Sequence, residues 1–397
     1  MSVILYTWEL GGGLGHLAQF LPVAEMLVKR GHTVHLAVKD IGTAARLFQH
    51  LDVHYHQAPW KYSPSRQPKQ PARTFAHILH NTGWETFEEL SATAGAWRHL
   101  MQSIRPDLIL LDHSPTAILA AQSLSCPKMT ITTGFNHPLD TSPLPDLRQW
   151  MTPEPERLLA DELQLLDTIN RYQRSVGLEP LSRVTEIFST IDEVFFATFP
   201  ELDPYHQARP QTKYHGTWSM PGGDNPEWPE GRGKRILAYL KEFKELGFLV
   251  EMLAQSKMPV LVFGERIPPA IRQRCSTPTL RFVDRPVDLN VACREADVVI
   301  HHAGHATTAA TLLAGTPSLL IPFHLEQTLT AMRTEKFRAA AVAGPMRRDQ
   351  LAANLHSVLN EPVYRNAAEN FARRYCDHDP NQAIEHCVSV AERLLTR

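Results

Sequence analysis

The hydrophobic residues of this chain fall into short, nearly continuous runs, separated by helix-length stretches with an apolar stripe. A short run that is apolar on both faces is typical of a strand in a parallel sheet whose faces are covered by helices. The pattern therefore predicts an α/β fold built from alternating strands and helices. In the first half of the chain we expect strands at 3–7, 33–38, 53–56, 108–111, 128–132 and 193–197.

The first helix is expected from about residue 16 to residue 30. It ends at Gly31, a residue type that often follows the last turn of a helix. Residues 74–104 and 151–190 also have a helical pattern, and both stretches are longer than a minimal strand crossover requires. Insertions of this kind on an α/β scaffold commonly shape a substrate pocket.

Between residues 199 and 233 the pattern breaks, and prolines and glycines crowd a stretch without a clear period. Such a composition indicates an interdomain linker. A second series of strands follows, at 235–240, 259–263, 280–283, 298–301 and 318–321. Helical patterns close the chain at 348–359, 362–375 and 381–395.

We therefore expect two Rossmann-like, doubly wound domains with an interdomain cleft, because ligands bind at the carboxyl ends of the strands in such sheets. The N-terminal domain, which would bind the acceptor, is expected at 1–205, and the linker at 206–233. The C-terminal domain is expected at 234–375, and a last helix at 376–397 should pack back on the first domain.

Composition narrows the class of protein. The net charge of −2 gives no argument for a nucleic-acid partner. The longest apolar runs are too short to span a bilayer, and the chain opens directly on a strand-like run. Five scattered cysteines without Cys-x-x-Cys spacing indicate free thiols and a cytoplasmic location.

The first candidate site is Gly11-Gly12-Gly13-Leu14-Gly15-His16, which follows the first strand and opens the first helix. Glycines allow the backbone to turn tightly and to approach a ligand closely. Histidine titrates near neutral pH, so His16 can act as a general base toward a hydroxyl group. A dinucleotide-binding loop or a histidine that caps the turn is the alternative, although His16 stands where the last glycine of Gly-x-Gly-x-x-Gly would be.

The second candidate is Asp112, at the carboxyl end of the fourth strand. This is the sheet edge where His16 is expected, and a carboxylate on one imidazole nitrogen fixes the tautomer and stabilises the imidazolium. Alternatively, Asp112 caps the helix that begins near Ser114-Pro115. The adjacent His113 is the rival for a catalytic role.

The third candidate is the segment 297–327, which is expected to form a strand, a tight turn, a helix and a second strand. The turn directs backbone N–H groups and the positive end of the helix toward a phosphate. A metal site made of His301, His302 and His305 is disfavoured, because strand neighbours point to opposite faces and no carboxylate stands at zinc-ligand spacing.

The residues of this segment resemble the donor-binding box of family 1 glycosyltransferases, the inverting Leloir-type enzymes with the GT-B fold. They include plant, macrolide and glycopeptide glycosyltransferases. The resemblance rests on His302-Ala303-Gly304-His305-Ala306-Thr307-Thr308, Ala314-Gly315-Thr316-Pro317, Ile321-Pro322 and Glu326-Gln327. The Gly15-His16 loop and Asp112 are similar to the family's catalytic His–Asp dyad.

The resemblance implies a role for each matching residue. His16 would deprotonate the acceptor and Asp112 would hold His16. The donor diphosphate would contact His302, Gly304, Thr307 and Thr308, while Glu326 and Gln327 would bind hydroxyls of the donor sugar. Family members need no metal or other cofactor, and the nucleotide sugar is a co-substrate.

Other assignments depend on position alone. Lys241 stands where relatives often have a Gly-Ser or Gly-Thr turn, and we expect it to contact phosphate. Arg285 and Val287 lie in the stretch that would bind the nucleoside, and Gly13, Trp84 and Phe135 are expected to bind the acceptor.

The chain departs from the family pattern at several positions. Ala310 stands where many relatives have a glutamate that binds the ribose hydroxyls, and Ala306 replaces a usual glycine or asparagine. Residues 284–287 contain no tryptophan to stack on a base. These departures leave both UDP and dTDP open as the nucleotide of the donor.

The predicted function is transfer of a hexose from a nucleotide-diphosphate sugar to a small, aromatic or lipophilic hydroxyl acceptor such as a natural product. One alternative is a GlcNAc transferase with a polyprenyl-linked acceptor, which has a similar glycine-rich loop and would bring the protein to a membrane surface. The others are a nucleotide-sugar epimerase of the same fold and a non-catalytic sugar-nucleotide-binding protein.

Overall fold

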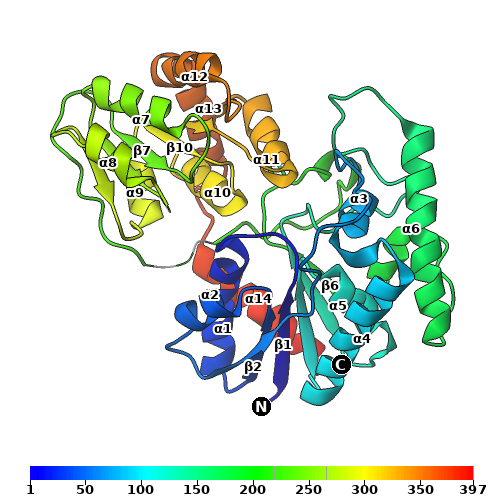
Figure 1. Cartoon of the computed structure of the whole chain (residues 1–397). Coiled ribbons are helices and arrows are strands. Elements are labelled where there is room, and N and C mark those ends of the chain that lie inside the picture. Colours follow the sequence, from blue (N-terminus) through cyan, green and yellow to red (C-terminus); the bar gives the residue numbers. More distant parts are fainter. Residues whose placement is uncertain (219, 221, 265, 397) are drawn as a thin grey trace. The chain divides into compact units, whose positions relative to one another are not determined.

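The computed structural model describes residues 1–218, 220, 222–264 and 266–396. Residues 219 and 221 of the predicted linker, residue 265 of the predicted C-terminal domain and residue 397 of the predicted last helix lie outside the described residues. The chain divides into two compact units (Figure 1). Unit 1 comprises Met1–Trp218 and Pro380–Arg397, and unit 2 comprises Ser219–Asp379. The domain boundaries expected from the sequence stay a prediction.

Unit 1 is built on one sheet of six parallel strands in the order β3-β2-β1-β4-β5-β6. Because β1 lies between β2 and β4, the winding reverses between β1 and β4, which is the switch point of a doubly wound sheet. The strands are β1 (Val3–Trp8), β2 (Thr33–Val38), β3 (Val53–Gln57), β4 (Leu108–Asp112), β5 (Lys128–Thr132) and β6 (Glu193–Phe196).

Helices cover both faces of this sheet (Figure 1). On one face lie α1 (Gly15–Lys29), α2 (Ile41–Leu47) and the last helix α14 (Pro380–Leu394). On the other face lie α3 (Phe75–Leu79), α4 (Phe87–Ile104), α5 (Pro115–Ala120) and α6 (Pro155–Ser175). Short turns of helix occur at His80–Trp84, Ala121–Ser123, Val184–Phe188 and His206–Ala208.

The stretch 74–104, which the sequence pattern predicts to be helical, is interrupted in the structure. Gly83 has a φ of +117°, outside the helical region, and breaks the chain direction after α3. Helix α4 then begins anew, because the hydroxyl of Thr86 accepts a hydrogen bond from the backbone N–H of Glu89 and caps its first turn. The stretch 151–190 is likewise interrupted: it contains α6 and, after a break, the short helical turn Val184–Phe188.

Unit 2 repeats the same topology. Its sheet has the order β12-β11-β10-β7-β8-β9, which is the order of unit 1 when its strands are counted from β7. The switch point therefore lies between β7 and β10. The strands are β7 (Ile236–Tyr239), β8 (Val260–Phe263), β9 (Leu280–Val283), β10 (Val298–His301), β11 (Ser318–Leu320) and β12 (Ala340–Val342).

The helices of unit 2 also form two layers (Figure 1). One core joins the sheet to α7 (Leu246–Gln255), α8 (Pro269–Cys275) and α12 (Arg348–Asn360). The opposite face carries α9 (Leu289–Glu295), α10 (His305–Leu313) and α13 (Pro362–Arg374), and α11 (Leu325–Lys336) connects β11 to β12. The prediction of two doubly wound α/β sheets is thus confirmed.

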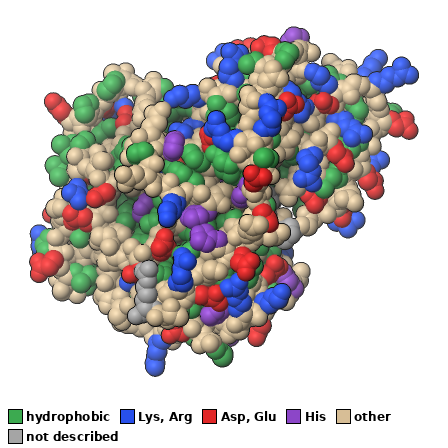
Figure 2. Space-filling view, turned by 180° about the vertical axis from the view of Figure 1, so that it is seen from behind, with side chains coloured by type: hydrophobic (Ala, Val, Ile, Leu, Met, Phe, Trp, Pro, Cys, Tyr) green, Lys and Arg blue, Asp and Glu red, His purple; other side chains and the backbone are tan. Residues whose placement is uncertain are grey.

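Helix α14 belongs to unit 1 although it follows unit 2 in the chain. It packs on α1, and its Glu392 accepts from Arg30 and from the ring of His32, whose Nε2 lies 3.2 Å from the carboxylate. Among the described residues, no helix is long and apolar enough to cross a membrane. On the face seen in Figure 2, acidic and basic side chains are interspersed, in keeping with a net charge of −2.

Candidate functional site

The side chains of His16 and Asp112 meet at the carboxyl edge of the unit 1 sheet. Strands β1 and β4 pair so that Trp8 stands opposite Asp112, and α1 starts a few residues beyond. Nδ1 of His16 lies 3.0 Å from Oδ1 and 2.9 Å from Oδ2 of Asp112. A carboxylate can only accept, so Nδ1 carries the hydrogen in the neutral ring and Nε2 keeps a lone pair.

Tyr6, which the sequence analysis does not single out, completes this arrangement. Its hydroxyl donates a hydrogen bond of 2.7 Å to Oδ2 of Asp112, and its ring stacks on Phe20 with centroids 3.8 Å apart. Burial and the charge of Asp112 raise the pKa of Tyr6 well above its usual range, so the phenol keeps its proton. The alternation of side chains along a strand is the sequence signal that could have indicated Tyr6. Tyr6 and Trp8 lie on the same face of β1, and the Trp8 ring stacks against His16.

The glycine loop lies beside the second ring nitrogen of His16, Nε2. Gly11 has a φ of +82°, and a Cβ at this position would lie 2.6 Å from Nε2 of His16. A side chain here would therefore cover the lone pair. Gly13 has the same φ of +82° in the next turn of the loop, so the chain passes close to this site without side chains of its own.

His113, the rival catalytic residue, is arranged differently. It adopts a left-handed backbone conformation with a φ of +43°. Its ring centroid lies 6.0 Å from that of His16, and the ring of Phe135 approaches His113 edge-on at 6.0 Å. The carboxylate of Asp112 is bonded to His16, so the geometry favours His16 as the residue with an oriented lone pair.

In unit 2 the corresponding edge carries His302, one residue after β10. Its Nδ1 lies 2.9 Å from the carbonyl oxygen of Ile321, and the backbone N–H of Lys241 donates to its Nε2 at 2.8 Å. A carbonyl only accepts and an amide N–H only donates, so the ring is neutral with its hydrogen on Nδ1. Burial lowers the pKa of His302 to about 4, which maintains the neutral form at physiological pH.

Both ring nitrogens of His302 are therefore occupied by backbone groups. The contact with a diphosphate that the resemblance implies is not available to them in this arrangement. The ring instead connects the segments that follow β7, β10 and β11. It holds the backbone N–H of Lys241 against the segment that leads into α10.

Helix α10 begins directly after this junction. Gly304 is its N-cap, no side chain caps the first turn, and no acidic residue lies in that turn. The first N–H groups of a helix have no partner within the helix, and they favour an anion. Thr307 is half-buried in the first turn, whereas Thr308 is buried and its hydroxyl donates to the carbonyl of Gly304 at 2.9 Å.

Comparison with known proteins decides the class. Residues 262–390 match the family described as "Erythromycin biosynthesis protein CIII-like, C-terminal domain". The PGL/p-HBAD biosynthesis rhamnosyltransferase of Mycobacterium bovis (strain BCG / Pasteur 1173P2) is 26% identical over 384 residues, covering 90% of this chain and 81% of the relative. The chain is a glycosyltransferase, and both matches support its likeness to family 1.

Two solved structures show the fold of this glycosyltransferase. The glycosyltransferase VinC in complex with dTDP has a TM-score of 0.63 and 18% identity, and the match covers 98% of this chain and 100% of VinC. The spinosyn rhamnosyltransferase SpnG complexed with thymidine diphosphate has a TM-score of 0.66 and 17% identity, with 98% and 100% covered. The predicted GT-B fold is confirmed.

The structure of the glycosyltransferase corrects one expectation about the acceptor site. Trp84 is 1% exposed, and its indole N–H donates to the hydroxyl of Thr116 at 2.9 Å. It is a core residue, because Gly83 turns the chain so that the next side chain packs inward. Phe135 is also buried, at 6% exposed, but its ring lies against His113 beside the dyad.

The residues expected to bind the donor all follow carboxyl ends of strands in unit 2. Arg285 and Val287 come after β9; Arg285 is exposed and pairs with Asp224 at 3.3 Å. Glu326 and Gln327 form the first turn of α11, where the Gln327 side chain accepts from the backbone N–H of Phe323 at 2.9 Å. Their roles toward a nucleotide sugar stay predictions.

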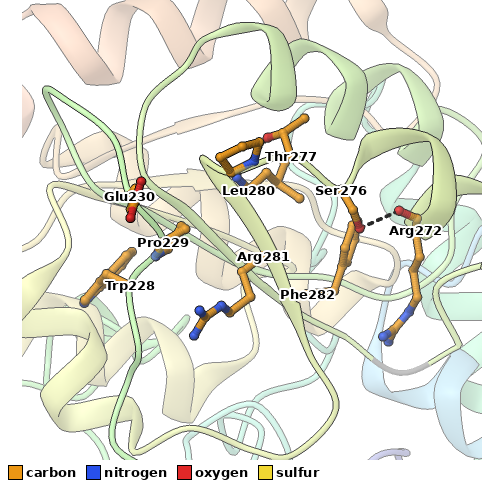
Figure 3. Close-up of a pocket in the computed structure, with 10 residues that line it drawn as sticks. Trp228, Pro229, Glu230, Arg272, Ser276, Thr277, Leu280, Arg281 and Phe282 are labelled. Carbon is orange, nitrogen blue, oxygen red and sulfur yellow. Dashed lines mark hydrogen bonds between the residues drawn. The ribbon is translucent and has the colours of Figure 1, made fainter.

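Unit 2 also contains a pocket beside the start of β9 (Figure 3). It is lined by Trp228, Pro229, Glu230, Arg272, Ser276, Thr277, Pro278, Leu280, Arg281 and Phe282. Leu280 begins β9 and Ser276–Pro278 precede it, so the pocket is at the amino end of this strand and not at the edge that carries His302. Within the described residues, no group of three or more His, Cys, Asp or Glu side chains is arranged to hold a metal ion.

Proposed function

We propose that this glycosyltransferase moves a hexose from a nucleotide-diphosphate sugar to a hydroxyl group of a small aromatic or lipophilic acceptor, with inversion at the anomeric carbon. The observation that supports this most directly is the orientation of His16. Asp112 holds Nδ1 at 2.9–3.0 Å, and Gly11, which has no side chain, lies beside Nε2.

In the proposed reaction, the acceptor hydroxyl gives its proton to Nε2 of His16 as its oxygen attacks the anomeric carbon. The bond between that carbon and the diphosphate oxygen breaks, and the nucleoside diphosphate leaves. Asp112 stabilises the imidazolium, and Tyr6 keeps the carboxylate in position through its hydroxyl.

Unit 2 would stabilise the charge that develops on the leaving diphosphate. The uncapped start of α10 offers backbone N–H groups and the positive end of the helix dipole. Thr307 and the Lys241 side chain would contribute directly, and His302 indirectly, by fixing the Lys241 backbone. Glu326 and Gln327 would bind the sugar hydroxyls. Because the start of α10 and the Lys241 side chain would stabilise the diphosphate charge, the reaction would need no metal ion.

For the nucleotide we favour dTDP. Ala310 is 4% exposed on α10 and has no group that could bind the ribose 2′-hydroxyl, so a uridine nucleotide would gain nothing from this hydroxyl there. Both solved relatives described above hold thymidine diphosphate, and the mycobacterial relative is a rhamnosyltransferase. dTDP-rhamnose is therefore the first donor to test.

The test is a donor screen with dTDP- and UDP-hexoses against phenolic, macrolide and polyprenyl-linked acceptors, followed by mass spectrometry of the products. We expect transfer to a phenolic or macrolide hydroxyl, with dTDP-sugars preferred. His16→Ala should lower kcat by about a thousandfold while calorimetry shows unchanged binding of dTDP, and His113→Ala should be far less affected.

Other outcomes would replace this proposal. Transfer only to the polyprenyl-linked acceptor would change the acceptor class, and donor conversion without any acceptor would indicate an epimerase. Binding of dTDP without turnover across the panel would indicate a sugar-nucleotide-binding protein. Full activity of the His16→Ala protein would remove His16 as the base.

A further inference from the structure

Glu9 is a buried carboxylate that the proposed reaction does not use. It follows the last residue of β1, and it is 1% exposed. It accepts from the backbone N–H of Thr116 at 2.6 Å on Oε1 and from the indole N–H of Trp97 at 2.7 Å on Oε2, and the Thr116 side chain and the Ala117 backbone add to the hydrogen bonding that lowers its pKa. Burial raises the pKa of Glu9 to about 7, which reflects the cost of placing a carboxyl group in the protein interior, so its position requires an explanation.

The two partners place Glu9 between the loops that carry the dyad. Thr116 lies four residues after Asp112, in the first turn of α5. On the other side, Glu9 stands between Trp8, whose ring stacks on His16, and Leu10, whose N–H donates to the carbonyl of His113 at 3.0 Å. One side chain thus ties the segment leading to His16 to the segment leading away from Asp112.

We propose that Glu9 is a positioning residue that sets the separation of His16 and Asp112 by holding the backbone of Thr116. The inference rests on the proposed function, in which His16 is the base. The hydrogen bond to Thr116 is the one that sets this separation, and the hydrogen bond to Trp97 anchors the carboxylate on α4. A base displaced by about 1 Å from its partner can lose roughly a hundredfold in rate.

The two hydrogen bonds can be separated by substitution. Trp97→Phe removes the anchor and keeps the tie to Thr116. In Glu9→Gln/Trp97→Phe the amide oxygen still accepts from Thr116, the charge is gone, and the amide N–H no longer opposes an indole N–H. In Glu9→Leu/Trp97→Phe the tie is lost in an otherwise similar protein, which makes the last two variants a matched pair.

The measurements are kcat, the KM for the donor, dTDP binding by calorimetry, and the NMR signal of the hydrogen-bonded Nδ1–H of His16. The Gln variant should stay within about threefold of Trp97→Phe in kcat and keep the Nδ1–H signal. The Leu variant should lose at least about tenfold in kcat and lose or shift that signal. Donor KM and dTDP binding should stay within about twofold in both.

Three results would overturn the inference. The Leu variant could retain kcat and the Nδ1–H signal, it could lose dTDP binding in parallel with kcat as general unfolding would, or the Gln variant could be as slow as the Leu variant. If the wild-type chain transfers no sugar, the proposed function fails, and the NMR signal in the matched pair still decides the role of Glu9.

Discussion

The two units share one topology, but they use the histidine near the switch point in different ways. In unit 1, His16 is bonded to a carboxylate through one nitrogen, and the other nitrogen faces a glycine. In unit 2, His302 is bonded through both nitrogens to backbone groups. A histidine next to a carboxylate can take up and release a proton. A histidine held between a backbone amide and a backbone carbonyl remains neutral and connects the two backbone segments.

The backbone around the two switch points is more alike than the side chains. After β4, His113 has a φ of +43°, and after β10, Ala303 has a φ of +56°. Left-handed conformations are uncommon for residues other than glycine and cost of order 1 kcal/mol. In each unit the fourth strand therefore ends in a tight turn that starts a helix at the carboxyl edge, and the side chains on that turn decide its chemistry.

The largest expected effect comes from replacing the carboxylate partner in unit 1. Asp112→Asn would present an amide N–H to Nδ1 of His16 and move the ring hydrogen to Nε2, where it blocks proton uptake. We expect kcat to fall by about a thousandfold, measured by product formation at saturating substrates. Binding of dTDP serves as the control and should not change. A loss below about threefold would mean that Asp112 does not set the tautomer.

The matching change in unit 2 should act on binding and not on the chemical step. His302→Leu leaves the N–H of Lys241 and the carbonyl of Ile321 without their partner, at about 1–3 kcal/mol for each buried group. We expect roughly tenfold weaker dTDP binding by calorimetry, and a lower free energy of unfolding in urea. If kcat at saturating donor falls as far as in Asp112→Asn, the assignment of the chemical step to unit 1 and of donor binding to unit 2 is wrong.

Acid should weaken unit 2 through its buried histidines. Burial lowers the pKa of His301 to about 3 from an ordinary value of 6.5. The unfolded chain then binds the proton more readily, so stability is complete above pH 6.5 and is lost as the pH falls toward 3. For His301 alone this amounts to about 2 kcal/mol between pH 7 and pH 5. Urea unfolding of the wild type and of His301→Asn at both pH values would measure it, and equal pH dependence would exclude His301 as the cause.

The smallest effect should come from Tyr6→Phe, which removes one donor from Asp112 and keeps the ring that stacks on Phe20. The carboxylate then carries more of its charge toward His16 and stabilises the imidazolium more. The acid limb of kcat/KM against pH should move upward by about half a unit, with a loss of at most about threefold at neutral pH. An unchanged profile would show that Tyr6 only fills space.

The pairing of His16 with Asp112 could be predicted from the sequence, because both residues follow strands whose carboxyl ends share one sheet edge. The contact forms across 96 positions of sequence, and strand order alone makes it possible. Most strands were predicted for a related reason, since their runs of apolar residues are buried on both faces. Strand β12 was missed, because Ala340-Ala341-Val342 is too short and its side chains too small to form such a run.

The features that escaped prediction depend on contacts between segments. A single sequence does not indicate that the Thr308 hydroxyl turns back to Gly304, or that backbone groups occupy both nitrogens of His302. Trp84 was misplaced because an aromatic residue in a helical stretch suits a pocket as well as a core. Only the left-handed turn at Gly83 directs it inward. Glu9 and Tyr6 gain their meaning from partners more than a hundred residues away.

The placement of α14 also bears on how the chain folds during synthesis. Unit 2 is one continuous segment, whereas unit 1 needs α14, which the ribosome produces after all of unit 2. Domains generally fold as units as they emerge. Unit 1 therefore cannot be completed, and the surface of α1 that α14 covers stays exposed, until all of unit 2 has been made. A nascent chain arrested before residue 380 should contain a folded unit 2 and an unfinished unit 1.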